Sequence, residues 1–253
     1  MILLLLLFAA IADDVVHLPA ASFSRGSERA PDEGPVRRIQ LSGYSIDKTE
    51  VSIAEFERFV AEGWRDAAHW SSEGRGWMGE HPRGLGPQLW RSGRPKDHPV
   101  VAVTWYEADA FCRWKGGHLP SEAQWERAAC AGSEGPYPWG DATNLDVRWT
   151  QAMEDGALLR VNTAAVTEDS TPNSLGMRHV IGNVWEWTAD WYHRDGYSNA
   201  AEMDPGGPST GRWRVLRGGS FANLPSYATC THREPARPDQ ARLTAGFRCA
   251  YSH

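Results

Sequence analysis

The densest group of chemically useful side chains lies in residues 182–192. They read Gly-Asn-Val-Trp-Glu-Trp-Thr-Ala-Asp-Trp-Tyr, so three indoles and a phenol lie beside the carboxylates of Glu186 and Asp190. Carboxylates are hard oxygen ligands of the kind that Ca²⁺ prefers, and each large ring can bury roughly 150–250 Å². Alternating side chains from Val184 to Thr188 are typical of a short strand. An aromatic core strand and a ligand-binding strand both fit this pattern.

Cysteine and histidine are the other residues that could do chemistry. The chain has four cysteines, an even number, and none has CxxC spacing. This spacing argues against a thioredoxin-like site or a zinc cluster and favours structural disulfides, for which three connectivities are open. The nine histidines form no HExxH or HxxxH motif, so zinc-dependent hydrolysis has no support.

An apolar run at the N-terminus predicts export. Met1–Ala12 is too short to span a bilayer but has the length of a secretory signal, with a small-x-small cleavage pattern at Ala10-Ile11-Ala12. No positive charge precedes the run, which is explained if the given sequence starts a few residues late. We expect a periplasmic or extracellular protein with no membrane span after signal removal. A first apolar strand of a cytosolic domain is the alternative interpretation.

Composition points to one loop-rich domain that does not bind nucleic acid. No linker, charge block or repeat divides residues 13–253, so we expect a single domain. The chain has 25 glycines and 16 prolines. Together these two residue types exceed their usual combined share of about 12 % of a chain. A net charge of −6 gives no basic excess for a nucleic-acid partner.

Regular elements are predicted to be few and short. We expect strands within Val15–Phe23 and Val36–Ile46, and anchored loops over Gly63–Lys96 and Gly132–Gly176. Three capping boxes each predict the start of an amphipathic helix, because the two side chains satisfy backbone N–H groups that a helix leaves free. The boxes are Ser52 with Glu55, Thr104 with Glu107, and Ser121 with Gln124.

Five blocks, in this order and spacing, resemble the sulfatase-modifying-factor family, which contains the formylglycine-generating enzymes. The resemblance runs from about Val15 to the C-terminus, and it implies the family's variant of the C-type-lectin fold, an α+β fold with little regular secondary structure. The five blocks are His98–Trp105, Leu119–Glu126, Gly182–Tyr192, Arg214–Phe221 and Gly246–Ala250.

The resemblance also implies which catalytic part is missing. Formylglycine-generating enzymes oxidise a cysteine of a client sulfatase with O₂ and a Cu(I) ion that two cysteine thiolates hold, and soft thiolates suit Cu(I). Those cysteines follow the Gly-Gly-Ser motif, which here is Gly218-Gly219-Ser220. The corresponding segment, Phe221–Thr229, has no cysteine. We therefore expect a family member without copper and without formylglycine-generating activity.

Parts of the family's pocket persist. The resemblance places Trp185 and Ser220 in the wall of the substrate and oxygen pocket, and Tyr227 and His232 lie in the segment that follows. These four residues are the pocket candidates. For Trp185 and Ser220, an interpretation as a core packing residue and a turn residue stays equally open.

The resemblance implies a calcium site and two disulfides as well. Relatives bind calcium with backbone oxygens at the positions of Gly182 and Val184 and with the carboxylate at Glu186. The position three residues before the glycine is His179 here, a poor calcium ligand, so we expect a weak site. A second calcium loop cannot be aligned through Asp141–Trp149. The secreted relatives favour the disulfides Cys112–Cys249 and Cys130–Cys230.

Three functions follow from these observations. The first is an exported binding or accessory module that takes a protein or peptide ligand at the pocket under Phe221–Ala245. The second is an oxidase of the same superfamily that acts on a protein or peptide-derived substrate without thiolate ligands. The third is a displayed, C-type-lectin-like ligand-binding protein. Whether the chain is an enzyme is left open. The candidates for a non-thiolate site are Tyr227, His232, Glu234 and Asp239.

Overall fold

A computed structural model describes residues 14–82, 84, 93–140, 163–167 and 172–253, together with the backbone of 153–154 and 157–158. The predicted export signal and the loop Asp141–Trp149 lie outside the described residues. None of the described helices has the length and apolar character needed to cross a membrane.

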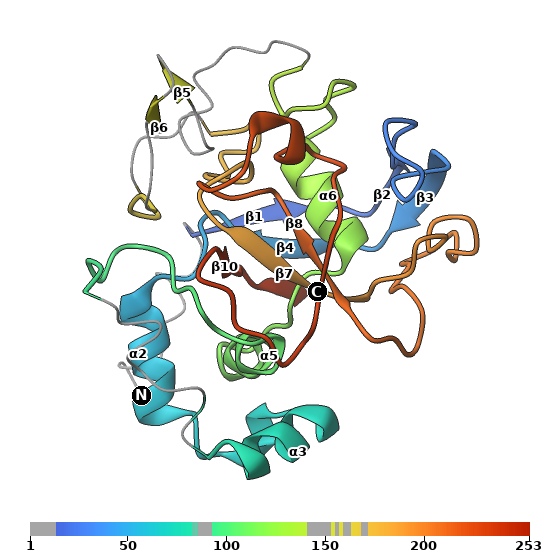
Figure 1. Cartoon of the computed structure of the whole chain (residues 1–253). Helices are drawn as coiled ribbons and strands as arrows, with labels where there is room; N and C mark the ends of the chain where they lie inside the picture. The colour runs from blue at the N-terminus through green and yellow to red at the C-terminus, as the bar shows by residue number, and fades with distance from the viewer. Residues whose placement is uncertain are drawn as a thin grey trace, which may run out of the picture.

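The centre of the fold is a four-stranded sheet with the order β10-β7-β8-β9 (Figure 1). Strand β10 runs parallel to β7, and the other pairs are antiparallel. A three-stranded sheet, β1-β4-β11, and the hairpins β2-β3 and β5-β6 complete the strands. Their bounds are β1 Val15–Leu18, β2 Ala21–Arg25, β3 Arg37–Leu41, β4 Tyr44–Asp47, β5 Met153–Glu154, β6 Ala157–Leu158, β7 Trp185–Trp191, β8 Arg214–Arg217, β9 Glu234–Ala236, β10 Ala245–Gly246 and β11 Ala250–Ser252.

The sequence analysis predicted a single strand in each of two stretches, Val15–Phe23 and Val36–Ile46. The structure has two strands in each: β1 and β2 in the first, and β3 and β4 in the second. The first stretch is divided after Leu18 by Pro19, which has no N–H to donate to a strand ladder. Residues 182–192, which we call the hub segment, were predicted correctly to contain a strand, because Trp185–Trp191 forms β7.

All three predicted capping boxes are present. They open α2 (Ile53–Glu62), α5 (Trp105–Trp114) and α6 (Glu122–Cys130), and in each one the N-cap side chain and the N3 side chain bond each other's backbone N–H. Short 3₁₀ turns, η2 (Ala67–His69) and η3 (Pro225–Tyr227), are also present.

One helix was missed: α3 (Ser72–Glu80) lies inside the segment predicted to be an anchored loop. Its three glycines, Gly74, Gly76 and Gly79, lower its intrinsic helix propensity. Packing explains why it forms, since Trp77 is buried and its ring stacks on Trp70 at a centroid distance of 6.1 Å. The prediction that tryptophans pin this region to the body is confirmed for the described ones.

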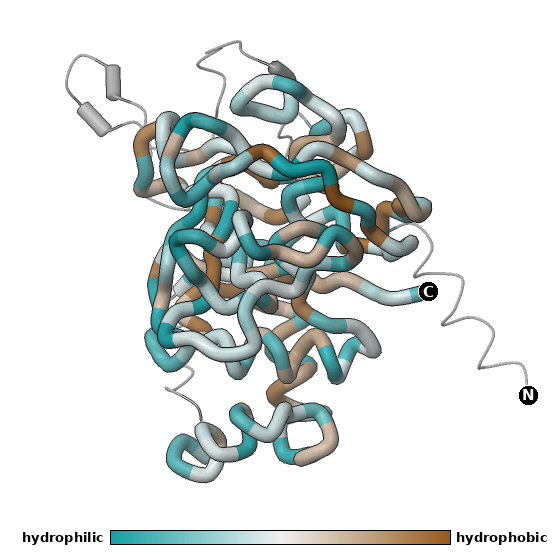
Figure 2. Tube along the Cα trace, turned by 90° about the vertical axis from the view of Figure 1, so that its right-hand side faces the viewer, coloured by the Kyte–Doolittle hydropathy of each residue, from teal (hydrophilic) through white to brown (hydrophobic). Residues whose placement is uncertain are grey.

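The core has two hydrophobic clusters. In one, Phe56, Phe59, Phe111 and Phe247 bring α2 and α5 against the C-terminal segment. In the other, Trp125 of α6 packs with residues of β1, β3 and β4. Hydrophobic stretches of the trace accordingly run through the middle of the molecule in Figure 2, while α3 lies at one end.

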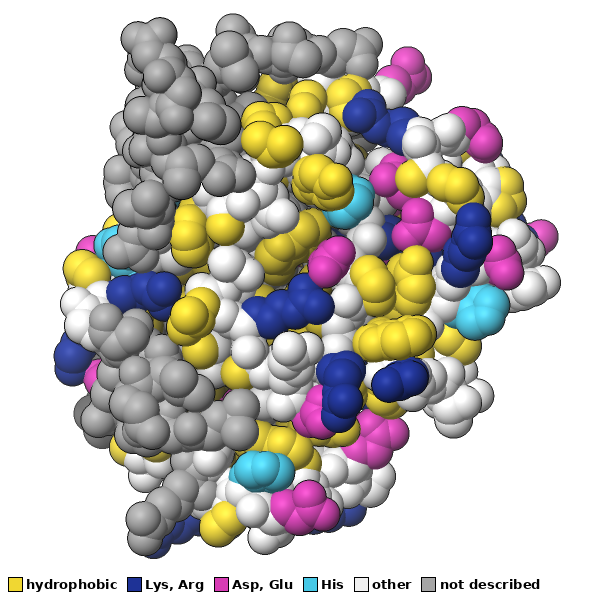
Figure 3. Space-filling view, in the orientation of Figure 1, with side chains coloured by type: hydrophobic (Ala, Val, Ile, Leu, Met, Phe, Trp, Pro, Cys, Tyr) yellow, Lys and Arg dark blue, Asp and Glu magenta, His cyan; other side chains and the backbone are white. Residues whose placement is uncertain are grey.

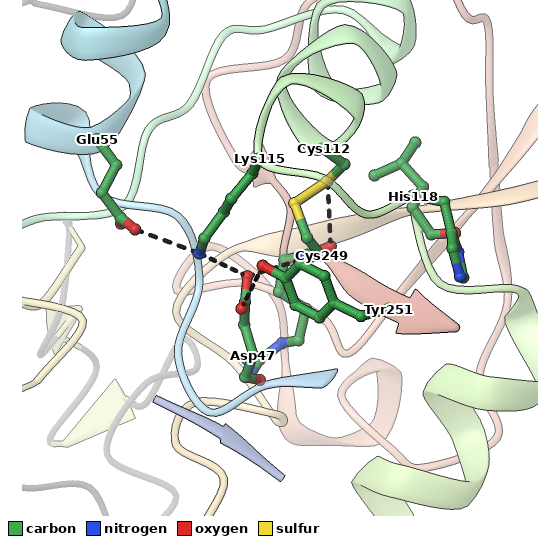
Figure 4. The surroundings of a disulfide bond; sticks show 9 residues. Asp47, Glu55, Cys112, Lys115, His118, Cys249 and Tyr251 are labelled. Carbon is green, nitrogen blue, oxygen red and sulfur yellow. Dashed lines mark hydrogen bonds and ion pairs between the residues drawn. A yellow bond between two sulfur atoms is a disulfide. The ribbon is translucent and has the colours of Figure 1, made fainter. Parts of the chain in front are cut away.

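The predicted disulfide Cys112–Cys249 is present and joins α5 to the residue before β11. Figure 4 shows its surroundings, where Lys115 lies between Asp47 and Glu55 at 3.1 and 3.4 Å. The hydroxyl of Tyr251 also donates to Asp47, at 3.0 Å. The disulfide and this ionic cluster together fix the last strand to the body of the protein.

Candidate functional site

The hub carboxylate, Glu186, is buried in a polar cage. Arg248 donates from Nε to Oε2 at 2.6 Å and from Nη2 to Oε1 at 2.7 Å, and the indole of Trp125 donates to Oε2 at 2.8 Å. Glu186 and Arg248 are both fully buried. A bidentate guanidinium is the strongest common partner of a carboxylate, so Glu186 works here as a structural anchor between β7, α6 and the C-terminal block.

A row of three rings runs from the core to the surface beside this anchor. The ring of Trp185 lies 5.8 Å from the ring of His232, which lies 5.4 Å from that of Tyr227 in an edge-on arrangement. The exposed fraction of the side chain rises along the row, because Trp185 is buried, His232 is 21 % exposed and Tyr227 is exposed. Three of the four predicted pocket residues therefore meet in space.

A residue that sequence reasoning missed completes this row. Oε1 of Glu33 lies 3.7 Å from Nδ1 of His232, and Glu33 also accepts hydrogen bonds from Ser27 and Thr231, each at 2.6 Å. Burial alone would raise the pKa of Glu33, but the hydrogen bonds from His232, Ser27 and Thr231 outweigh it and lower the pKa to about 2. Glu33 is therefore ionised at neutral pH. In the sequence it belongs to a polar turn-forming loop, and no local signal marks it.

The fourth pocket residue, Ser220, makes local contacts instead. Its hydroxyl donates to Oδ1 of Asn223 and accepts from the backbone N–H of Ala222. The preceding Gly219 has a φ of +78°, and a Cβ there would lie 2.5 Å from the Cβ of Ala228. Glycine is required at that position, so the Gly-Gly-Ser motif has a clear structural role as a turn.

The two other candidates for a non-thiolate site lie in separate ion pairs. Glu234 pairs with Arg242 at 2.8 Å, and Asp239 pairs with Arg237 at 2.7 Å. Among the described residues, neither carboxylate forms an ion pair or a hydrogen bond with His232 or Tyr227. The candidate site is therefore Glu33, His232, Tyr227 and Trp185, without Glu234 and Asp239.

Exposed apolar side chains lie next to the ring row. We call Trp139, Leu224 and Tyr227 the aromatic surface, because their exposed fractions are 39 %, 47 % and 50 %. Tyr137 connects them, since its ring stacks on Trp139 at 5.4 Å and its hydroxyl donates to the carbonyl of Pro225 at 3.4 Å. Figure 3 shows hydrophobic side chains gathered in the middle of one face, next to a histidine.

Comparison with known proteins decides the family. Residues 9–253 match the sulfatase-modifying factor enzyme 1-like domain. The chain belongs to this family. It is 36 % identical to the formylglycine-generating enzyme of Streptomyces coelicolor over 93 % of this chain and 88 % of that protein. It is also 36 % identical to the enzyme of Thermomonospora curvata, over 95 % of this chain and 94 % of that one.

Solved structures confirm the loop-rich fold of this sulfatase-modifying-factor chain. PvdO from Pseudomonas aeruginosa superimposes with a TM-score of 0.75 over 94 % of both chains, at 22 % identity. That identity supports the fold and nothing finer. The predicted family and fold class are therefore confirmed.

The carboxylate that the family resemblance assigns to calcium is engaged in other contacts. Three hydrogen bonds already occupy the Glu186 carboxylate, and one donor is the cationic Arg248. A ring nitrogen of His179 lies 3.1 Å from the carbonyl of Ala165. The described residues contain no group of three or more His, Cys, Asp or Glu side chains that could hold a metal ion. Ca²⁺ needs six to eight oxygens, so an ion here would compete with Arg248 and Trp125 for the Glu186 carboxylate. Calcium binding stays a prediction.

The second disulfide expected from secreted family members is absent, so that prediction is corrected. Cys130 and Cys230 are free cysteines, although their thiols lie within hydrogen-bonding distance of each other. Burial raises the pKa of Cys130 well above its ordinary value, and the neighbouring Cys230 raises it further. A thiolate is the form that attacks to make a disulfide, and in the structure both cysteines are in the reduced form. The pair lines a cavity of 840 Å³ between the β2-β3 hairpin and α6.

Proposed function

We propose that this chain is an exported member of the sulfatase-modifying-factor family that binds a polypeptide and does not generate formylglycine. The observation that carries the proposal is the composition of Phe221–Thr229. That segment has no cysteine in the place where the family resemblance puts both copper ligands. The free cysteines of the described residues are Cys130, at the end of α6, and Cys230, which follows this segment directly, and both line the cavity beside α6.

The same segment supports a binding role. It carries Leu224 and Tyr227 of the aromatic surface, with Trp139 beside them. Exposed aromatic rings supply large contact areas at low cost in side-chain entropy, and they are enriched at the energetic centres of protein interfaces. A polypeptide that buries Trp139 and Tyr227 would therefore gain affinity from this surface.

Export has support of its own. The disulfide Cys112–Cys249 fits a protein that folds in an oxidising compartment. The apolar run Met1–Ala12 has the pattern of a secretory signal. Expression of the full chain with a C-terminal tag tests this part. The tagged protein should leave the cytosol with its N-terminus at Asp13, whereas an uncut chain in the cytosol would contradict export.

A formylglycine assay tests the negative half of the proposal. The purified chain is given copper, a reductant, O₂ and a sulfatase-type cysteine peptide, and the peptide is analysed by mass spectrometry. We expect no aldehyde above a protein-free control, while the Streptomyces coelicolor enzyme converts the peptide in parallel. Aldehyde formed by this chain would overturn the proposal.

A peptide selection tests the positive half. A displayed library of random twelve-residue peptides is selected on the immobilised chain, and the Tyr227→Ala variant serves as the counter-selection target. We expect enriched peptides that bind the wild type at least tenfold better than the variant, because a buried aromatic anchor carries about 2 kcal/mol or more. Enrichment of nothing, or of peptides that bind both proteins equally, would contradict the proposed surface.

A further inference from the structure

The imidazole of His232 is held on three sides. Trp185 lies against it from the core, Tyr227 lies edge-on toward the surface, and Glu33 faces its Nδ1 atom at 3.7 Å. Its backbone N–H donates to the hydroxyl of Thr229 at 3.2 Å. The ring therefore has a defined position, and 21 % of the side chain is exposed next to the aromatic surface.

Glu33 selects the tautomer of this imidazole. The carboxylate can only accept hydrogen bonds and faces Nδ1 at 3.7 Å, so of the two neutral tautomers of His232 it favours the one that carries its proton on Nδ1. In that form Nε2 has a free lone pair. Nε2 is the second ring nitrogen, and no described residue forms a hydrogen bond with it. The second ring nitrogen of this partly exposed side chain is therefore available as a hydrogen-bond acceptor.

A hydrogen-bond acceptor beside exposed aromatic rings would suit an aromatic side chain that carries a hydroxyl group. An aromatic side chain can pack against Tyr227 and Trp139, and a phenol adds an O–H group that can donate to Nε2. Phenylalanine fits the rings equally well but leaves Nε2 without a donor. A site that hydrogen-bonds a hydroxyl discriminates strongly against the analogue that lacks it.

We propose that Nε2 of His232 is the specificity-determining acceptor for a tyrosine side chain of the bound polypeptide, with Glu33 as the residue that positions it. This inference rests on the proposed binding function of the aromatic surface. It adds the residue type that the ligand presents there.

Two small probes test the inference directly. N-acetyl-L-tyrosinamide and N-acetyl-L-phenylalaninamide differ by one hydroxyl, and their Kd values follow from shifts of the histidine ring resonances in NMR titrations of the ¹⁵N-labelled chain. We expect the tyrosine probe to bind about fivefold to tenfold more tightly, which is the usual effect of one net hydrogen bond. The same spectra report the tautomer of His232, which should carry its proton on Nδ1.

Variants show which side chain is responsible for the preference for the tyrosine probe. In His232→Phe the ring remains but the acceptor is lost, so the two probes should bind equally. In His232→Gln the side chain still carries an acceptor oxygen, so part of the preference should remain. Glu33→Gln should shift the His232 tautomer and reduce the preference. Glu28→Gln, an exposed change in the same loop, should alter neither, and thermal unfolding confirms that each variant is folded.

The outcomes separate this inference from the function on which it rests. Equal binding of both probes to the wild type overturns the tyrosine assignment and leaves the aromatic surface as a binding site. A preference that survives in His232→Phe also overturns it, because another group would then read the hydroxyl. Binding of neither probe, together with a failed peptide selection, overturns both proposals.

Discussion

Arg248 holds the carboxylate of Glu186 through two hydrogen bonds of 2.6 and 2.7 Å, and neither side chain is exposed. The pair joins the central strand β7 to the last part of the chain. Further bonds from Arg248 reach the carbonyls of Asp47, Lys48 and Arg178 at 2.9 to 3.1 Å. The guanidinium therefore makes its hydrogen bonds inside the protein and connects the central sheet to the C-terminal segment.

Breaking this pair should destabilise the protein strongly. In Arg248→Met, the buried carboxyl group of Glu186 loses its cationic partner, and removing one partner of a buried ion pair typically costs about 3–5 kcal/mol of unfolding free energy. Urea denaturation measures the loss. The matched control is Arg237→Met, since Arg237 and Asp239 form an exposed pair and its loss should change stability little. Similar effects of both changes would contradict the structural role of Arg248.

Substitution of the Glu186 carboxylate also tests calcium binding. If the family's calcium site exists here, added calcium raises the melting temperature of the wild type by mass action, and Glu186→Gln removes that response. His179→Asn, which supplies an oxygen ligand, should then increase it. An unchanged melting temperature in calcium and in chelator would show that Arg248 and Trp125 occupy the carboxylate in place of an ion.

The disulfide Cys112–Cys249 should contribute a large part of the stability. The bridge spans 137 residues of sequence, and a native disulfide that closes a long loop typically contributes about 2–5 kcal/mol. The double variant Cys112→Ala/Cys249→Ala should unfold at lower urea concentration by that amount. A double variant as stable as the wild type would show that the ionic cluster around Asp47 and Lys115 is sufficient.

Thiol counting tests the corrected disulfide assignment. The structure predicts two labelled cysteines per chain, Cys130 and Cys230, after denaturation without a reductant. Intact-mass spectrometry after alkylation gives the count. The variant Cys130→Ser should give one label. No label in the wild type would mean that the two neighbouring thiols oxidise after export and that the original prediction of a second disulfide was correct.

Stability should fall in acid partly because of Glu33. Its pKa is about 2 in the folded protein, below its ordinary value of 4.5, so the unfolded chain binds more protons between these values. The stabilisation is present above about pH 4.5 and is lost as the pH falls toward 2. Unfolding midpoints between pH 6 and 2.5 should drop less steeply in Glu33→Gln than in the wild type. Parallel profiles would exclude Glu33 as a contributor.

The sequence alone determined features that depend on neighbouring residues. The capping boxes at Ser52, Thr104 and Ser121 were predicted correctly, because each consists of contacts between residues three positions apart. The hub strand was predicted correctly from the alternation of its side chains. The order of the five blocks gave the family and the fold class, and through them the disulfide Cys112–Cys249.

Tertiary structure decided everything that depends on distant segments. Glu33 meets His232 only because the loop before β3 folds against the segment that leads to β9, and nothing near Glu33 in the sequence marks this contact. Helix α3 forms because Trp77 packs on Trp70, although the three glycines of α3 lower its helix propensity. The approach of Cys130 to Cys230 and the pairing of Glu186 with Arg248 likewise follow from packing, because the fold decides which distant side chains come within contact distance.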